Sequence, residues 1–236
     1  MKKNIGACKA RNKGIEISKG EYISFLDDDD EFIPKYIEKS INYMIKNNYE
    51  VIFGDLTLID DETGNKKILK YKKNFNLTKE SLLKKHLIEI ISGGITFVYK
   101  KKVLIEIGGF YDISASQEYI VMLNTILGGY KIGYFEFSGA IGHIVKNSSK
   151  ITGSQKAIDA KKEVLRLVKP HLFHLKINDR RKVIFRLYLF MFLNYLKAKN
   201  LKFIFYGINL CLYLDLLILK FFKKEEQTLE GNIIYK

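Results

Sequence analysis

The chain has 236 residues, of which 47% are hydrophobic and 28% are charged, with 17 glycines and 2 prolines. This composition is that of a folded globular protein, and it excludes collagen-like, mucin-like and Gly/Ser-linker chains. Cys8 and Cys211 lie far apart and neither belongs to a Cys-x-x-Cys pair. A disulfide framework or a cysteine zinc site is therefore not expected, and a reducing cytoplasm fits best.

The formal net charge of +14 is distributed unevenly. Residues 1–150 hold 23 Lys or Arg against 19 Asp or Glu, whereas residues 151–236 hold 17 against 7. The positive excess lies in the C-terminal third and favours an acidic partner there, either an anionic membrane surface or a nucleic acid. A solvated basic face with no partner explains the charge equally well. No nucleic-acid recognition motif accompanies the charge, so we expect no nucleic-acid binding.

The first predicted elements alternate between strand and helix. Residues 21–26 are a short apolar run that predicts a buried strand, and four aspartates follow it. Apolar residues every three to four positions after Pro34 predict an amphipathic helix that starts at this proline. A strand over 51–59, turn residues at 60–65 and a return strand over 67–71 come next.

The alternation continues to about residue 150. Helices are predicted from Thr78 to about Ile91, just before Gly108-Gly109, and over 117–127, and strands over 95–99, 131–137 and 140–145. Strands interleaved with helices predict a first domain of the α/β class, with strands and helices in layers, over residues 1–150.

From residue 154 the apolar period is helical. A helix to about Val168, a break at Pro170 and a helical hairpin of residues 180–199 and 201–223 are predicted. Residues 151–236 would thus form a basic, apolar helical tail. The longest apolar run, residues 203–219, is short for a membrane span and carries Asp215, so we expect it to pack or to lie in a membrane interface.

The segment Phe25–Phe32 (FLDDDDEF) carries the sharpest chemical signal. Four adjacent carboxylates after a buried strand repel one another unless a cation neutralises them. In extended backbone Asp27 and Asp29 face the same way, whereas Asp28 and Asp30 face the other way. Hard oxygen ligands favour Mg²⁺, Mn²⁺ or Ca²⁺. The alternative is a solvated acidic loop without a metal.

Several segments in order resemble family 2 glycosyltransferases. The matching positions of the central block are Asn4, Gly6, Ala10-Arg11-Asn12, Gly14, Lys19-Gly20-Glu21-Tyr22-Ile23, Phe25-Leu26-Asp27 and Pro34. GGITFVYKKKVLIEIGGFYD resembles the segment beyond the family's metal site, and SQEYIVMLNTILGGYKIGYF resembles the helix that carries its general base. The resemblance covers about residues 4–150.

The resemblance implies a partial, Rossmann-like GT-A fold, a mixed sheet flanked by helices. It also implies a nucleotide-sugar-dependent transferase that inverts the anomeric centre. Asp27 and Asp29 would hold Mn²⁺ or Mg²⁺ against the donor's diphosphate. Arg11, Asn12 and Asp28 would lie at the donor. A structural salt bridge between Arg11 and the acidic loop is the alternative for that residue.

Two further residues take roles from the resemblance. Glu118 falls where the family usually has the aspartate that deprotonates the acceptor hydroxyl, although a glutamate at a helix N-terminus is also favoured by the helix dipole alone. His143 would supply a third metal ligand or contact a phosphate, with a purely structural histidine as the alternative.

The family's opening strand with its Ile-Pro-x-Tyr-Asn-like turn, and its later Asp-Asp-Gly-Ser-like motif, do not occur in this sequence. The resemblance therefore implies that the first nucleotide-binding portion is missing, leaving the strand before Asp27 at an uncovered sheet edge that another chain or a second copy would complete. We expect a transferase of cell-surface polysaccharide or glycolipid synthesis, peripheral at the cytoplasmic face of the membrane, with a glycan or lipid-linked acceptor. The alternative is a catalytically silent remnant or interaction module.

Overall fold

The computed structural model describes residues 4–70, 77–89, 91, 94–144, 155–197 and 199–211. The chain forms two compact units. The first contains most residues up to 148, and the second contains the residues from 149 onward together with two short stretches, 87–89 and 113–116. The expected domain limits, 1–150 and 151–236, remain a prediction. The two short stretches lie within 1–150 but belong to the second unit.

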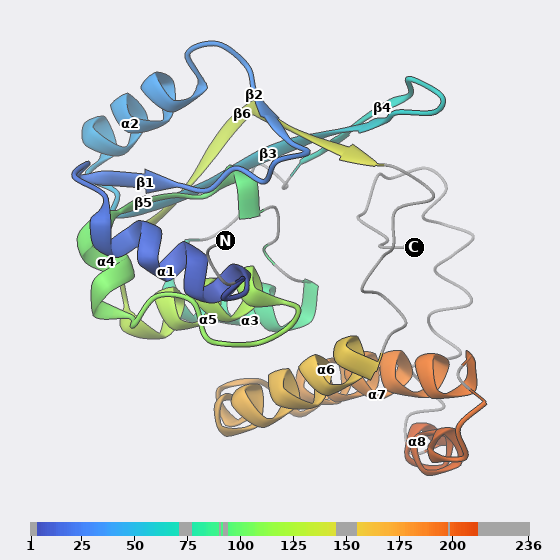
Figure 1. The fold of residues 1–236 in the computed structure, drawn as a ribbon. Coiled ribbons are helices and arrows are strands. Elements are labelled where there is room, and N and C mark those ends of the chain that lie inside the picture. The colour runs from blue at the N-terminus through green and yellow to red at the C-terminus, as the bar shows by residue number, and fades with distance from the viewer. Residues whose placement is uncertain are drawn as a thin grey trace. The chain divides into compact units, whose positions relative to one another are not determined.

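The first unit is a mixed sheet with helices on both faces (Figure 1). Its helices are α1 (Ala7–Ile17), α2 (Tyr36–Asn47), α3 (Lys79–Glu89), α4 (Lys101–Glu106) and α5 (Gln117–Gly128), with the 3-10 turn η1 (Gly94–Thr96). Its strands are β1 (Tyr22–Ser24), β2 (Glu31–Phe32), β3 (Val51–Asp60), β4 (Lys66–Leu69), β5 (Val98–Lys100) and β6 (Ile132–Ile144). Figure 1 shows α2 on one side of the sheet and α1, α3, α4 and α5 on the other.

The strand order is β1-β5-β3-β6-β2, and β4 extends from β3. Among the strand pairs of the described residues, β3 and β6 run parallel and the others are antiparallel. The prediction of an α/β fold with a mixed sheet is therefore confirmed. Among the described residues β1 has β5 as its one neighbour, so the acidic segment that follows β1 begins at an edge of the sheet.

One strand prediction is wrong in detail, because residues 132–144 form the single strand β6 rather than two strands. Ser138-Gly139 reads as a turn in the sequence, but a Cβ at position 139 would lie 2.3 Å from Cδ2 of Tyr36. The glycine is therefore needed for close packing inside a strand. The strand is irregular at this glycine: Gly54 pairs with Phe135 and Leu56 with Ala140, so residues 136–139 of β6 bulge opposite Asp55 of β3.

The start of α2 also differs from the prediction. The helix begins at Tyr36 and not at Pro34, because Lys35 has a left-handed backbone with φ of 65°. This bend turns the ring of Tyr36 into the core, where it is 1% exposed and its hydroxyl donates to the Thr96 carbonyl at 3.1 Å. The ring thereby anchors α2 to η1.

The second unit consists of α6 (Gln155–Val168), the 3-10 helix η2 (Lys169–His174), α7 (Ile177–Lys197) and α8 (Lys202–Cys211). The break near Pro170 and the turn near Lys199 agree with the prediction. The α7 and α8 helices pack through aromatic rings, with Tyr195 stacked on Tyr206 at 5.5 Å between centroids. The predicted continuation of the last helix to residue 223 lies outside the described residues. Arg186 of α7 donates to the carbonyl of Leu87, a residue of the same unit, at 2.8 Å.

Candidate functional site

The acidic segment turns immediately after β1. The Asp30 amide donates to the Asp27 carbonyl at 3.2 Å, and Asp28 and Asp29 form the turn between them. The prediction based on extended backbone, in which Asp27 and Asp29 face one way, therefore rests on a wrong local geometry. The turn leaves Asp27, Asp28 and Asp29 exposed, whereas Asp30 is half-buried.

Arg11 on α1 joins the acidic segment to the start of α5. Its guanidinium lies 2.7 Å from a carboxylate oxygen of Asp27 and 3.6 Å from one of Glu118. It also donates to the side-chain oxygen of Gln117. The planar fork of an arginine suits such a site, since its five N–H donors serve several acceptors at once. The structural salt bridge considered for Arg11 is therefore present, and it brings together the predicted metal ligand and the predicted general base.

The arginine side chain is held from the side by an aromatic pair. Its guanidinium carbon lies 5.5 Å from the centre of the Phe110 ring, and Phe25 packs edge-on against the same ring at 4.8 Å. Only 19% of the Arg11 side chain is exposed. Apolar walls limit the water around the guanidinium, which strengthens its attraction for the two carboxylates.

Glu118 is the second residue of α5, where the positive end of the helix dipole favours a carboxylate. Its side chain is 37% exposed. Gly94 lies directly against it, because a Cβ at position 94 would come within 2.4 Å of Cγ of Glu118. The glycine makes room for the carboxylate to reach Arg11, a function that the sequence does not indicate.

Asn12, predicted at the donor, uses both groups of its amide on the loop after α4. Its Nδ2 donates to the Phe110 carbonyl at 2.8 Å, and its Oδ1 accepts from the Phe110 amide at 2.7 Å. A Cβ on Gly109 would lie 2.4 Å from the same oxygen, and Gly109 has a φ of 68°. Asn12 thus fastens α1 to the loop that carries Phe110; its role at the donor remains a prediction.

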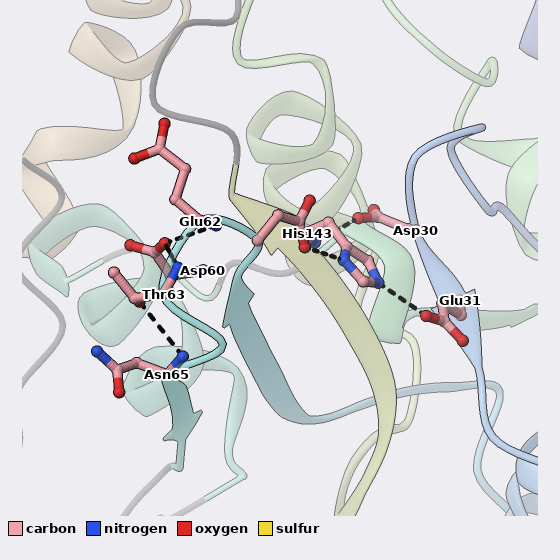
Figure 2. Close-up of polar contacts among 8 residues, drawn as sticks. Asp30, Glu31, Asp60, Glu62, Thr63, Asn65 and His143 are labelled. Atoms are coloured by element: carbon pink, nitrogen blue, oxygen red, sulfur yellow. Dashed lines mark hydrogen bonds and ion pairs between the residues drawn. The ribbon is translucent and has the colours of Figure 1, made fainter.

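His143 near the end of β6 lies among carboxylates other than Asp27 and Asp29 (Figure 2). Its Nδ1 is 2.6 Å from Asp61 and its Nε2 is 2.8 Å from Glu31. Hydrogen bonds to Asp61 and then to Glu31 raise the pKa of the imidazole. The His143 amide also donates to Asp30 at 3.3 Å. Both ring nitrogens therefore have carboxylate partners, and the predicted metal-ligand role stays a prediction.

The pKa of the Asp30 carboxyl is raised by its surroundings in the acidic segment. Burial is the main reason why the pKa of its carboxyl is raised, and the neighbouring charges of Asp29 and Asp27 raise it further. The hydrogen bond from the His143 amide acts in the opposite direction. A cation at this segment would relieve the repulsion among these carboxylates.

The donor set fits a divalent metal ion in its chemistry, although the protein supplies only part of a coordination shell. Asp27 and Asp29 present exposed carboxylate oxygens, the ligands that Mg²⁺ and Mn²⁺ prefer. Within the described ranges, no three His, Cys, Asp or Glu side chains converge so as to hold a metal ion. An ion bound there would keep positions for oxygen ligands from a substrate.

The second unit carries an exposed apolar stripe on α8 and the turn before it. We call the side chains of Leu201, Ile204, Phe205 and Ile208 the α8 face; they are between 48% and 75% exposed. Their spacing places them on one side of the helix. Lys197, Lys199 and Lys202 lie at the same end of the α7–α8 pair. Among the helices that the structure describes, none combines the length and apolar character needed to cross a bilayer.

Comparison with known proteins gives a match to a family model and relatives that are similar over part of their length. Residues 1–108 match the family model "Glycosyl transferase family 2". The chain is 32% identical over 137 residues to an uncharacterised glycosyltransferase of Methanocaldococcus jannaschii, covering 57% of this chain and 46% of the relative. It is 36% identical over 58 residues to UDP-Glc:alpha-D-GlcNAc-diphosphoundecaprenol beta-1,3-glucosyltransferase WfgD of Escherichia coli, covering 25% of this chain and 23% of that protein. The chain thus spans less than half the length of either relative.

Solved structures show the same fold at low sequence identity. S. aureus TarS 1-349, crystallised in complex with UDP-GlcNAc, superposes with a TM-score of 0.54 and 14% identity, covering 77% of this chain and 52% of that one. The likeness extends the family match from the sequence to the arrangement of the sheet and its helices, which is the GT-A fold.

Proposed function

Residues 1–108 match glycosyltransferase family 2, and we propose that the chain is a family 2 glycosyltransferase that transfers a sugar from a nucleotide-sugar donor to a glycan or lipid-linked acceptor. The observation that carries the proposal is the meeting of Asp27 and Glu118 on the guanidinium of Arg11. The reaction needs a metal ligand on the donor side and a base on the acceptor side, and this contact brings together Asp27 and Glu118, the residues proposed for these two roles.

Glu118 is the general base in this proposal. Its carboxylate removes the proton of the acceptor hydroxyl as the acceptor oxygen bonds to the anomeric carbon and the bond to the nucleoside diphosphate breaks. One base suffices for such an inverting displacement, in contrast to the two carboxylates of a retaining hydrolase. Arg11 holds Glu118 in place through the pair at 3.6 Å.

Asp27 and Asp29 are the residues that would hold the divalent ion, with Asp28, Asn12 and Arg11 toward the donor. When bound, the ion neutralises the charge that accumulates on the departing diphosphate. Arg11 orients the Asp27 carboxylate through the contact at 2.7 Å. The substrate classes are supported by relatives: TarS was crystallised with UDP-GlcNAc, and the name of WfgD specifies a diphosphoundecaprenol acceptor.

The α8 face places the enzyme at a membrane surface in this proposal. Apolar side chains on one side of a helix, with lysines beside them, suit a helix lying in the interface of an anionic bilayer. A lipid-linked acceptor would be presented at that surface, on the cytoplasmic side. The supporting observations are the exposed Leu201, Phe205 and Ile208 and the excess of positive charge in residues 151–236.

Titration calorimetry with UDP-GlcNAc and MnCl₂ tests the donor site. We expect a binding heat that disappears in the double variant Asp27→Asn/Asp29→Asn, since uncharged amides bind divalent ions poorly. Asp112→Asn, an exposed carboxylate whose partner is Lys9, is the matched control and should keep the heat. Absence of heat at millimolar ligand in the unaltered chain would instead favour the silent remnant, a protein that keeps the fold without binding a donor.

A further inference from the structure

The four residues before α5 belong to the second unit and contact its helix α6. Ile113 is 7% exposed, and the Ser114 hydroxyl donates to the Lys156 carbonyl of α6 at 3.0 Å. The ammonium of Lys161, one turn further along α6, donates to the Ser116 hydroxyl at 2.8 Å. The loop 113–116 is thus attached to α6 at two points, both within one compact unit.

Ser116 adopts a backbone conformation that a serine rarely takes. Its φ of 64° lies in the left-handed region, where the Cβ of an L-residue crowds its own backbone. Such a conformation persists only where surrounding contacts hold it. The hydrogen bond from Lys161 is such a contact, and the next two residues along the chain are Gln117 and Glu118, which bind Arg11.

Lys161 itself lies in an unusual environment for a lysine. Its ammonium is 5.4 Å from the centre of the Phe190 ring. Burial, assisted by the positive charge of Arg186, lowers the pKa of Lys161 to about 8. A lysine placed in such surroundings costs stability, so its contact with Ser116 indicates a function beyond solubility.

From these contacts we infer that Lys161 is a positioning residue for the reaction: by holding Ser116 in its left-handed conformation it sets the first turn of α5 and thereby the place of the Glu118 carboxylate. The inference rests on the proposed function for the role of Glu118. The attachment of the loop to α6 is independent of that function. If Lys161 has this role, the helical unit contributes to the chemistry as well as to the proposed membrane contact.

The test uses the full-length chain with Lys161→Met, which keeps the apolar stem and removes the amine, and Ser116→Ala, which removes the hydroxyl. Lys156→Met is the matched control, since its side chain is exposed and only its backbone carbonyl contacts the loop. Hydrogen–deuterium exchange of the peptide spanning residues 113–121 should be faster in both variants and unchanged in the control. The C-terminal half of α5 should exchange as before.

Steady-state kinetics give the second readout. We expect kcat to fall about 10- to 100-fold in both variants while KM for the donor changes little, because a misplaced base slows the chemistry without weakening donor binding. The double variant should be no slower than either single one, since both substitutions break the same link. If Lys161→Met fails to fold, Ser116→Ala breaks the same hydrogen bond without touching the lysine.

The outcomes separate this inference from the proposed function. Faster exchange near residue 117 in a chain whose unaltered form transfers no sugar would support the positioning of α5 and reject the transferase. Unchanged exchange in both folded variants overturns the inference whatever the activity is. Faster exchange with unchanged kcat also overturns it, because Glu118 would then not depend on Ser116.

Discussion

Arg11 is the residue that the acidic side chains of the candidate site share as a partner. It lies within ion-pair distance of Asp27 and Glu118, and its side chain is mostly buried against Phe110. A cation at this point lets two carboxylates from different elements lie close together without repelling each other. It also limits how far each carboxylate moves, which is what a site must do to orient donor and acceptor.

Replacing Arg11 should therefore affect activity more than stability. For Arg11→Met we expect kcat/KM to fall about 100-fold, because the metal ligand and the base lose their common partner. The pairs are partly exposed, so the free energy of unfolding should fall by only about 1 kcal/mol. Sugar transfer and urea denaturation measure the two effects. Lys13→Met on the same helix removes the exposed pair with Glu16 and should leave both values unchanged; an equal loss there would contradict this role for Arg11.

The position of Gly94 gives a sharper prediction about Glu118. A methyl group at position 94 would lie 2.4 Å from Cγ of Glu118, so Gly94→Ala should push the carboxylate away from Arg11. We expect kcat to fall about tenfold or more. Gly14→Ala is the comparison, because Gly14 has open space around it and a backbone conformation that alanine adopts without strain. A normal kcat in Gly94→Ala would argue against Glu118 as the base.

His143 makes the stability of the first unit depend on pH. Hydrogen bonds to Asp61 and Glu31 raise its pKa in the folded chain above the unfolded value of about 6.5. The protonated imidazole therefore stabilises the fold fully below that value, and this contribution is lost as the pH rises through the folded pKa. Urea denaturation across pH 6 to 7.5, a range below the pKa of about 8 of Lys161, should show the free energy of unfolding falling with pH. His143→Gln should remove this dependence and the exposed His174→Gln should keep it; a slope that survives in His143→Gln would refute the assignment.

At the scale of elements, α1 is attached to the loop after α4 through a paired amide contact. Asn12 exchanges two hydrogen bonds with the backbone of Phe110, and Gly109 makes room for its side chain. The contact fixes α1 relative to the loop, and α1 carries Arg11. In the proposed function, the position of Arg11 would therefore depend on the hydrogen bonds of its neighbour Asn12.

Two substitutions on α1 separate this contact from helix propensity. Asn12→Ala should lower the free energy of unfolding by about 1–3 kcal/mol, because the Phe110 amide and carbonyl lose their partners. Gly14→Ala, two residues further along, should raise it by about 0.5–1 kcal/mol, because its Cβ would meet no neighbouring atom. Urea denaturation of both variants decides the point. Equal stability of Asn12→Ala and the unaltered chain would mean that the amide contact is not formed in solution.

At the scale of the whole molecule, the basic third of the chain and the α8 face both favour binding to an anionic membrane surface. The apolar stripe offers area for insertion between lipid headgroups, and the lysines beside it favour an anionic surface. Such a dock would bring the chain to a membrane surface, where the proposed lipid-linked acceptor would be presented.

Vesicle sedimentation tests the dock. We expect the chain to bind vesicles containing phosphatidylglycerol, and Phe205→Ser/Ile208→Ser to bind about tenfold more weakly, since two inserted side chains are lost. Ile45→Ser/Ile105→Ser removes two equally exposed apolar side chains from the first unit and is the matched control. Equal losses in the two pairs, or equal binding to neutral vesicles, would reject the α8 face as the docking surface.

Most helices and strands follow from local sequence signals. The apolar stripe of α2, the glycine pair after α4 and the alternation of strands and helices predict the α/β class, because each depends on neighbours in the chain. The errors arose where a distant group decided the outcome. Gly139 reads as a turn in the sequence, yet it lies within a strand because the ring of Tyr36 packs against it.

The sequence by itself determined the kinds of residue available for chemistry, a run of aspartates after a strand and a glutamate at a helix start, since these are local facts. Only the tertiary structure decided which of them meet. Arg11 and Gln117 are 106 positions apart, and Ser116 and Lys161 are 45 apart. Contacts over such separations depend on how every intervening element packs, so no local pattern contains them. For the same reason His143 lies beside Glu31 and Asp61, partners that its place in the sequence does not reveal.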